Sequence, residues 1–399
     1  MRDKNALTII VILTLPFQFN IITDSYGIIK EEILEEWKTN RELTYYEDYL
    51  AEKITYYVGI ITSIILVFLY YAIRKMRIVI SLSFFLNGIT WLIYIATNEK
   101  RVYILILVRG LQGIFLSVFQ TSHCIYLMHF ARPDIICFIG NLIVTAMYIG
   151  LLFINFLFYC FKWRTVVIVC AIQSFVFSVL IWLVPEFYIK PKSQTNNRIY
   201  DKNNRRSLLT MIFLMVLQQL SGIGILLGHL SQILTSVGLS LDHHLQLCLF
   251  SFVCFLSTFV SAFVSDFVGI RLMWSISAFG LCIGLAIYGI TLKIKLMDSV
   301  ATLGIFIYFL FYALGEGPIP WHLCGTLFPE EIQIESAAIN VCENFFFFPI
   351  LQIIWNNLNK KAGQFGSIVF SFVVCFVAIF CGFLVPSLEH SDTEDINVI

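Results

Sequence analysis

The chain has 399 residues, of which 59% are hydrophobic and 13% are charged, and its mean hydropathy is +0.84. Because about a quarter of the residues in a soluble domain are charged, this composition excludes an ordinary soluble protein and indicates a chain that crosses a lipid bilayer many times. The formal net charge is zero, so the overall charge does not indicate nucleic acid as a partner.

Apolar runs of about twenty residues are long enough to span a bilayer. The sequence contains twelve such runs, which predicts an all-α membrane protein with twelve transmembrane helices. The first run continues into an acidic loop without a small-residue cleavage site, so we interpret it as a retained first helix and not as a removed signal peptide. The runs are residues 6–29, 54–73, 78–97, 102–130, 135–161, 165–184, 207–237, 245–265, 272–292, 299–328, 336–358 and 364–385.

Two loops near the start of the chain differ in charge. Residues 30–53 carry eight acidic and four basic side chains, whereas the short loop 74–77 carries three bases and no acid. Since basic loops are retained in the cytoplasm, this contrast predicts that both termini are cytoplasmic. We expect a multi-pass protein of the plasma membrane, and we interpret the acidic loop as a solvated segment over its outer face.

The polar, asparagine-rich stretch 185–206 separates the sixth apolar run from the seventh. It predicts a cytoplasmic linker between two six-helix halves, residues 1–184 and 207–385, with a cytoplasmic tail at 386–399. The eleven cysteines fall inside the apolar runs or at their edges, without a CxxC pair or a cluster with histidine. We therefore predict that they are packing residues and that the chain binds no metal.

Two of the apolar runs contain residues that break helices. The tenth includes the string GEGPIPW at residues 315–321, and the seventh includes QQLSG at residues 218–222. Breakers are tolerated inside a bilayer where neighbouring helices or a water-filled cavity satisfy the freed backbone groups, so interrupted helices indicate a transport site. A kinked packing helix is the alternative. The predicted break in the tenth helix involves Gly315, Gly317, Pro318 and Pro320.

The two strings resemble motifs of the sugar-porter branch of the major facilitator superfamily, in which helix 7 carries QQLSGIN and helix 10 carries GxGPIPW. The chain has QQLSGIG and GEGPIPW, and it is similar to insect members that carry trehalose or hexoses. Asp266, Gly269 and Arg271 resemble a charged gate motif between helices 8 and 9. The resemblance is strong in the C-terminal half and faint in the N-terminal half. It implies the major facilitator fold and transport of a sugar by alternating access.

A sugar is bound by amides and hydroxyls that both donate and accept hydrogen bonds, and by aromatic faces that cover its C–H surface. The chain offers Gln218, Gln219, Trp321 and Asn344 at the family's positions, and the resemblance implies that they are substrate-binding residues. Taken without the family, two adjacent amides in an apolar helix are more often contacts between helices.

Other positions of the family's sugar-binding set have changed. Gly224 stands where the helix-7 motif has Asn, and residues 228–229 (GH) stand where the family has an aromatic pair. Cys254 replaces a polar residue of helix 8, and Phe345 replaces the Trp that follows the helix-11 Asn. About half of the set implied for the C-terminal half is therefore absent.

Ionisable residues inside a membrane are costly unless they are paired, which makes them candidates for a functional role. Arg109 matches an arginine of helix 4 in the family. Glu316 and Glu343 have no counterpart there. Three arrangements remain open for these two acids: they face the cavity, they pair with Arg109 or His322, or they lie near an interface.

The charged network of the inner gate has also changed. His129, Thr326 and Gln333 stand where the family has Glu, Glu and Arg. Because removing the partners of a buried charge together costs less than removing one of them, the joint change predicts a relaxed inner gate. Either an altered transporter or a protein that no longer transports is consistent with it.

Two functions of different classes follow. The first is a facilitative carrier for a hexose, trehalose or a related polyol, and the second is a non-transporting relative that acts as a sensor or membrane scaffold. The sequence has no P-loop, GxSxG elbow or HExxH motif, so it indicates neither an enzyme nor a cofactor. The expected partners are a small sugar and the lipid bilayer, with the oligomeric state left open.

Overall fold

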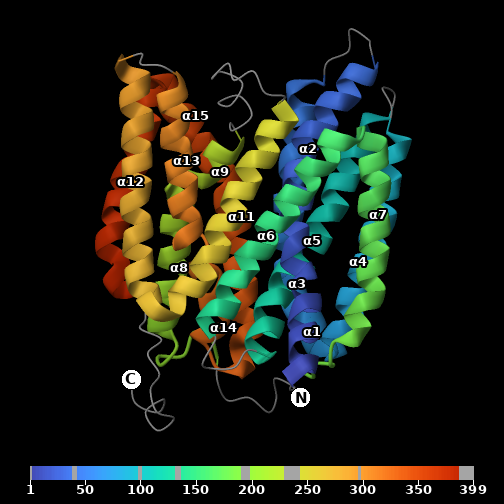
Figure 1. Cartoon of the computed structure of the whole chain (residues 1–399). Helices are drawn as coiled ribbons and strands as arrows, with labels where there is room; N and C mark the ends of the chain where they lie inside the picture. Colours follow the sequence, from blue (N-terminus) through green and yellow to red (C-terminus); the bar gives the residue numbers. More distant parts are fainter. Residues whose placement is uncertain are drawn as a thin grey trace.

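The helices of this chain stand side by side in one bundle, and α1 begins at the same end of it as that at which the twelfth span ends (Figure 1). We call this end the terminal end and the opposite one the distal end. The described chain holds no β-strand beyond a single bridge between Lys75 and Tyr188. The computed structural model describes residues 2–37, 43–97, 101–130, 136–189, 198–228, 243–294 and 298–385.

The described helices confirm the predicted all-α fold with twelve spans. Ten helical segments are long and apolar enough to cross a membrane, and the pair α8–α9 and the apolar segment Ile368–Leu384 supply the other two spans. The α-helices are α1 (Arg2–Ile12), α2 (Thr14–Trp37), α3 (Tyr45–Ile73), α4 (Met76–Ile93), α5 (Val102–Phe130), α6 (Ile136–Cys160), α7 (Trp163–Leu180), α8 (Arg205–Leu220), α9 (Ile223–Gly228), α11 (His243–Val268), α12 (Ile270–Ile294), α13 (Asp298–Leu314), α14 (Ile319–Thr326) and α15 (Gln333–Phe380). Four short 3₁₀ turns accompany them within these ranges, η1 (Tyr94–Ala96), η3 (Ile181–Leu183), η5 (Glu330–Ile332) and η6 (Cys381–Leu384).

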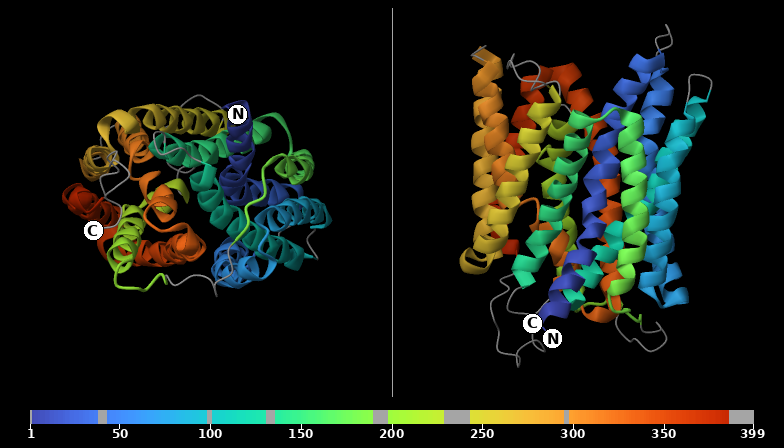
Figure 2. Two further views of the ribbon diagram at one scale, coloured as in Figure 1. Left: turned by 90° about the horizontal axis from the view of Figure 1, so that it is seen from below. Right: turned by 45° about the vertical axis from the view of Figure 1, so that its right-hand side comes forward.

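The spans are grouped into two halves of six. In the first half α2 packs against α6, α3 against α5 and α4 against α7, and in the second half α12 packs against α13 and α15 (Figure 2). The halves meet where α3 contacts α15 and where α6 contacts α11. Polar side chains support the second contact, because the Asn155 amide donates to the Ser251 hydroxyl at 2.7 Å. The boundaries at residues 184 and 207 remain a prediction.

Local sequence explains where several helices begin and end. The Thr44 hydroxyl accepts from the Glu47 backbone N–H at 3.3 Å, and the Glu47 carboxylate accepts from the Thr44 N–H at 3.0 Å, which caps the start of α3. The long helix α15 holds both the eleventh and the twelfth span, and Gly363 divides them with a φ of 69°. Glycine adopts this left-handed conformation at little cost, so the chain can change direction there.

Parts of three predicted segments lie outside the described residues. They are the end of the seventh apolar run with the aromatic-pair position at 229, the middle of the linker and the predicted tail (229–237, 190–197 and 386–399).

Helices α3 and α5 approach each other closely at a glycine. A Cβ atom on Gly113 would lie 2.3 Å from the Thr55 carbonyl oxygen, whereas a Cβ on Gly110, one turn earlier, would lie 3.5 Å from the nearest side-chain atom of Ile54. We therefore expect Gly113→Ala to lower stability by about 1–3 kcal/mol, since the backbone must move to admit the methyl group. Gly110→Ala is the matched control and should unfold near the temperature of the unmodified protein. Equal melting temperatures for the two variants in detergent would contradict this contact.

Candidate functional site

The interrupted seventh and tenth spans lie side by side. The seventh span breaks between α8 and α9, where Gly222 has a φ of 97°, and the tenth breaks between α13 and α14. A break leaves backbone carbonyls without helical partners. The Gln218 side-chain N–H₂ donates to two of them, the Glu316 oxygen at 2.9 Å and the Gly317 oxygen at 2.7 Å. Gln218 therefore holds the two breaks together.

Further hydrogen bonds fix the shape of the two breaks. The Ser221 and Tyr308 hydroxyls lie 3.1 Å apart and tie the seventh span to α13. The Glu316 backbone N–H donates to the Ser277 hydroxyl of α12 at 2.8 Å. Gly315 packs so tightly on α12 that a Cβ there would lie 2.5 Å from the Met273 carbonyl oxygen. The tenth span is thus bonded and packed at its break, not loosely kinked.

The two prolines of the string stand where a helix begins. Pro318 is the residue before α14 and Pro320 is the second residue of that helix. The first turn of a helix has N–H groups with no helical partner, so a proline there removes no hydrogen bond. The string therefore starts a new helix after the break.

Gln219 differs from its neighbour in its contacts. Its side chain is buried, and its N–H₂ contacts the Met215 sulfur at 3.9 Å, which is a weak partner. The Asn344 side chain is also buried, and its amide forms no hydrogen bond within the part of the chain that the structure describes. These two amides keep most of their bonding capacity for another molecule.

Gln219 of α8 and Asn344 of α15 belong to helices that contact each other. A Cβ on Gly224 of α9 would lie 2.7 Å from the ring of Phe348 of α15, so these residues are neighbours. Gly222, at the break of the seventh span, likewise lies beside Ser371 and Trp355 of α15. Phe345, next to Asn344, packs its ring on that of Tyr56 in α3 with the centroids 5.9 Å apart. This part of α15 therefore contacts the first half.

Trp321 joins the two halves on the terminal side of the break. Its ring lies 6.2 Å from the ring of Phe19 in α2 and 6.0 Å from that of His123 in α5, centroid to centroid. Its carbonyl oxygen accepts from the Cys124 thiol at 3.3 Å. The buried indole therefore packs where the two halves meet beside the break.

Arg109 lies within the first half, away from both acids of the second half. It is almost fully buried, and its guanidinium donates to the Ile22 carbonyl at 2.6 Å, to the Ala51 carbonyl at 3.3 Å and to the Gln112 side chain at 3.1 Å. These bonds connect the first, second and fourth spans. A charge held by backbone carbonyls in this way fixes the packing of the half.

The two unmatched acids do not pair with Arg109. The Glu316 carboxyl group is fully buried and has no hydrogen-bond partner in the described part of the chain, and it lies near Cys282 and Cys375 within the second half. One Glu343 oxygen likewise has no partner there. The expected alternative of an ion pair with Arg109 is therefore wrong for this structure.

The gate residues between the eighth and ninth spans are described only in part. Asp266 lies near the end of α11, and its side chain is outside the described atoms. Arg271, in the first turn of α12, donates to the Val385 carbonyl at 3.0 Å. This bond links the start of the ninth span to the end of the twelfth.

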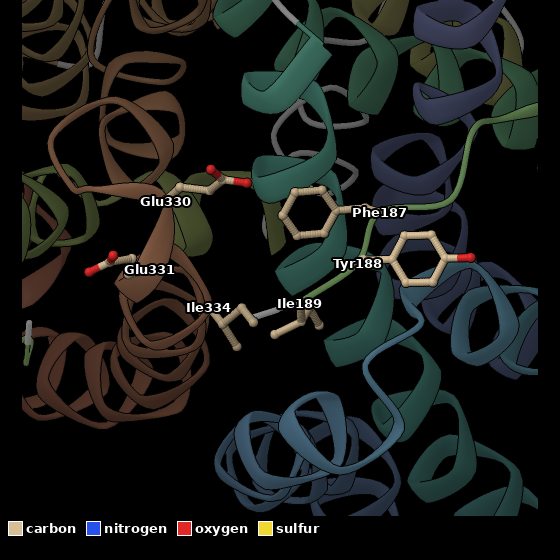
Figure 3. A pocket seen from close by; sticks show the side chains of 6 residues that line it. All are labelled: Phe187, Tyr188, Ile189, Glu330, Glu331 and Ile334. Carbon is tan, nitrogen blue, oxygen red and sulfur yellow. The ribbon is translucent and has the colours of Figure 1, made fainter. Parts of the chain in front are cut away.

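The halves also meet at the terminal end. The Tyr71 hydroxyl of α3 donates to the Glu335 carboxylate at 2.9 Å, and His129 lies 3.6 Å from the Glu330 carboxylate. Residues 187–189, which follow the sixth span, line one side of a small pocket, and Ile334 and the two acids of η5 line the other (Figure 3). Gln333 donates to the Gly325 carbonyl at 2.9 Å and so secures the turn after α14. A tyrosine hydroxyl and a histidine of the first half thus contact carboxylates of the second half. They do so at the end where the family's charged pairs were expected to be missing.

We expect Tyr71→Phe to weaken this closure, since it removes one hydrogen bond to a carboxylate that joins the halves and keeps the ring. A single bond of this kind contributes about 1 kcal/mol or more, so the population open at the terminal end should rise several-fold. The measurement is the rate at which a cysteine placed in α14 reacts with a thiol reagent from that side, in a chain without its native cysteines. An unchanged rate would show that this bond does not hold the end closed.

Comparison with known proteins identifies the fold and the family. The family model for "Sugar (and other) transporter" matches residues 188–399, which is more than half of the chain. The chain belongs to this family. As expected for a sugar porter, its fold is similar to that of the proton:xylose symporter XylE bound to 6-bromo-6-deoxy-D-glucose, with a TM-score of 0.80, 16% identity and 97% of each chain covered. Similarity to the inward-open conformation of XylE from E. coli is lower, with a TM-score of 0.69 at 16% identity over 98% of each chain.

Sequence relatives of this sugar porter include insect trehalose transporters. It is 25% identical to the facilitated trehalose transporter Tret1 of Apis mellifera ligustica over 362 residues, which cover 78% of this chain and 71% of the relative. It is 28% identical to trehalose transporter 1 of Drosophila melanogaster over 203 residues, 49% of this chain and 24% of that protein. The match thus spans about a quarter of the length of the Drosophila relative.

Proposed function

We propose that this sugar porter is a facilitative carrier for trehalose, a hexose or a related polyol in the plasma membrane, with its terminal end in the cytoplasm. The two halves, residues 1–184 and 207–385, rock about a site near the middle of the bilayer and expose it to either side in turn. Its trehalose-carrying relatives and the basic loop at 74–77 support this assignment.

The observation that carries the proposal is the difference between the two adjacent amides. The Gln218 N–H₂ donates to two carbonyls of the helix-10 break, whereas the buried side chains of Gln219 and Asn344 have few hydrogen bonds to the described residues. Buried polar groups are normally bonded, and a sugar hydroxyl can both donate to and accept from an amide. Gln219, Asn344 and the indole of Trp321 together supply the chemistry that binds a sugar.

The test is uptake of radiolabelled trehalose and glucose by proteoliposomes that contain the purified chain. A facilitative carrier equilibrates the label across the membrane with saturable kinetics and does not concentrate it. Uptake no faster than into protein-free vesicles overturns the proposal.

A non-transporting sensor or scaffold is the second candidate. The changed binding positions, Gly224 and Cys254, and the changed gate positions, His129 and Gln333, favour it. This alternative predicts sugar binding without flux, which equilibrium binding of labelled trehalose to the detergent-solubilised chain distinguishes from transport.

A further inference from the structure

Several buried amides outside the expected binding set have no hydrogen-bond partner among the described residues, and two of them lie near the helix-10 break. Gln120 of α5 and Asn340 of α15 are fully buried, and neither the oxygen nor the nitrogen of either side chain is bonded within the described part of the chain. A buried amide without a hydrogen-bond partner destabilises the conformation in which it is buried. The four unbonded atoms of these two residues therefore indicate that another conformation or a bound molecule supplies their hydrogen bonds.

Bonded neighbours place both residues around α14. Cys124 contacts the Trp321 carbonyl oxygen, and Gln120 lies one turn earlier on the same face of α5. The Ser336 hydroxyl donates to the Cys324 carbonyl oxygen at 2.6 Å, and Asn340 lies one turn later on the same face of α15. Gln120 and Asn340 thus approach α14 from opposite halves of the molecule.

The direction of each span sets their depth. The fourth span runs toward the terminal end and the eleventh runs away from it, so each amide lies about 6 Å further from that end than the contact beside it. Asn344 comes one turn after Asn340, at the level of the break. Asn340 therefore stands between the level of Asn344 and the contacts that close the terminal end.

We propose that Gln120 and Asn340 form a second binding level, which takes the hydroxyl groups of a polyhydroxylated solute when the terminal ends of the two halves separate. This inference rests on the proposed carrier function. Each amide has a carbonyl that accepts and an N–H₂ that donates, so each can bind the hydroxyls of a sugar. In the closed arrangement the two residues are packed without partners, and separation of the halves admits the solute between them.

Sided transport kinetics test the proposal. Gln120→Met and Asn340→Leu remove the amides and keep similar volumes. We expect each to raise the KM for trehalose or glucose leaving from the cytoplasmic face about five-fold or more, and to change the KM from the external face much less. Both should raise the melting temperature in detergent, since an unbonded buried amide is removed. Gln120→Asn and Asn340→Gln keep an amide and should keep more of the cytoplasmic-side affinity.

Gln173 provides a matched control. Both of its amide atoms are also buried without a partner, but it lies in α7, which packs on α2, α4 and α6 of its own half. Gln173→Met should raise the melting temperature and leave both KM values unchanged. If Gln120→Met and Asn340→Leu behave like Gln173→Met, the second binding level is wrong and the carrier function stands. If the unmodified chain moves neither sugar, the carrier function fails and this inference fails with it.

Discussion

Replacing Gln218 with leucine is expected to remove most of the folded protein from the membrane. The Gln218 amide supplies the donors for two carbonyls of the helix-10 break, those of Glu316 and Gly317. Leucine leaves both buried acceptors unbonded, at a cost of about 1–3 kcal/mol each, which is a large share of a typical stability of about 5–15 kcal/mol. Fluorescence-detected size-exclusion chromatography of the solubilised protein, with its melting temperature, measures this loss.

The same change at the neighbouring residue has a different expected result. Gln219→Leu leaves no backbone group without a donor, because the Gln219 amide contacts only the Met215 sulfur at 3.9 Å among the described residues. The amount of folded protein should stay near that of the unmodified chain, while trehalose or glucose uptake falls several-fold because a hydrogen bond to the solute is lost. Normal uptake by Gln219→Leu, or equal instability of the two variants, would contradict the division of roles between these amides.

Replacing Arg109 with leucine should also cause a large loss of folded protein. Its guanidinium donates to carbonyls of the first and second spans, and hydrogen bonds from a charged group contribute about 1.5–3 kcal/mol each. Arg109→Lys keeps the charge but not the forked geometry, so an intermediate melting temperature is expected.

Arg164 is the matched control for Arg109. Its side chain is 55% exposed and pairs with Glu36 at 2.8 Å, so Arg164→Leu should change stability by about 1 kcal/mol or less. A melting temperature for Arg109→Leu close to that of Arg164→Leu would show that the buried guanidinium does not hold the first half together.

The sequence predicted the two helix breaks because glycine and proline act locally. Gly315, Gly317 and Pro318 stand within four residues of one another, which disfavours a continuous helix, and the structure ends α13 and begins α14 around them. The same local reasoning missed Asn340, although its spacing of four residues from Asn344 marks one face of a helix. A search for polar residues at that spacing along the eleventh run finds it.

The charged residues were harder to interpret from the sequence. Glu316 was open to pairing with Arg109, but the structure places Glu316 near Cys282 and Cys375, whereas Arg109 donates to carbonyls of the first two spans. His129 stands where the family has an acid, yet it lies against Glu330 in a contact that the charge pattern did not predict. Pairing depends on distances between spans, which a single sequence does not contain.

The sequence by itself determined that this chain is a twelve-span membrane protein with two broken helices, because bilayer thickness requires about twenty apolar residues per span and because breakers act on their own neighbours. Only the tertiary structure decided which buried amides are bonded and which remain available. Gln218 and Gln219 are chemically identical neighbours, but a helix turns by about 100° from one residue to the next, so one meets the carbonyls of residues almost a hundred positions away and the other does not.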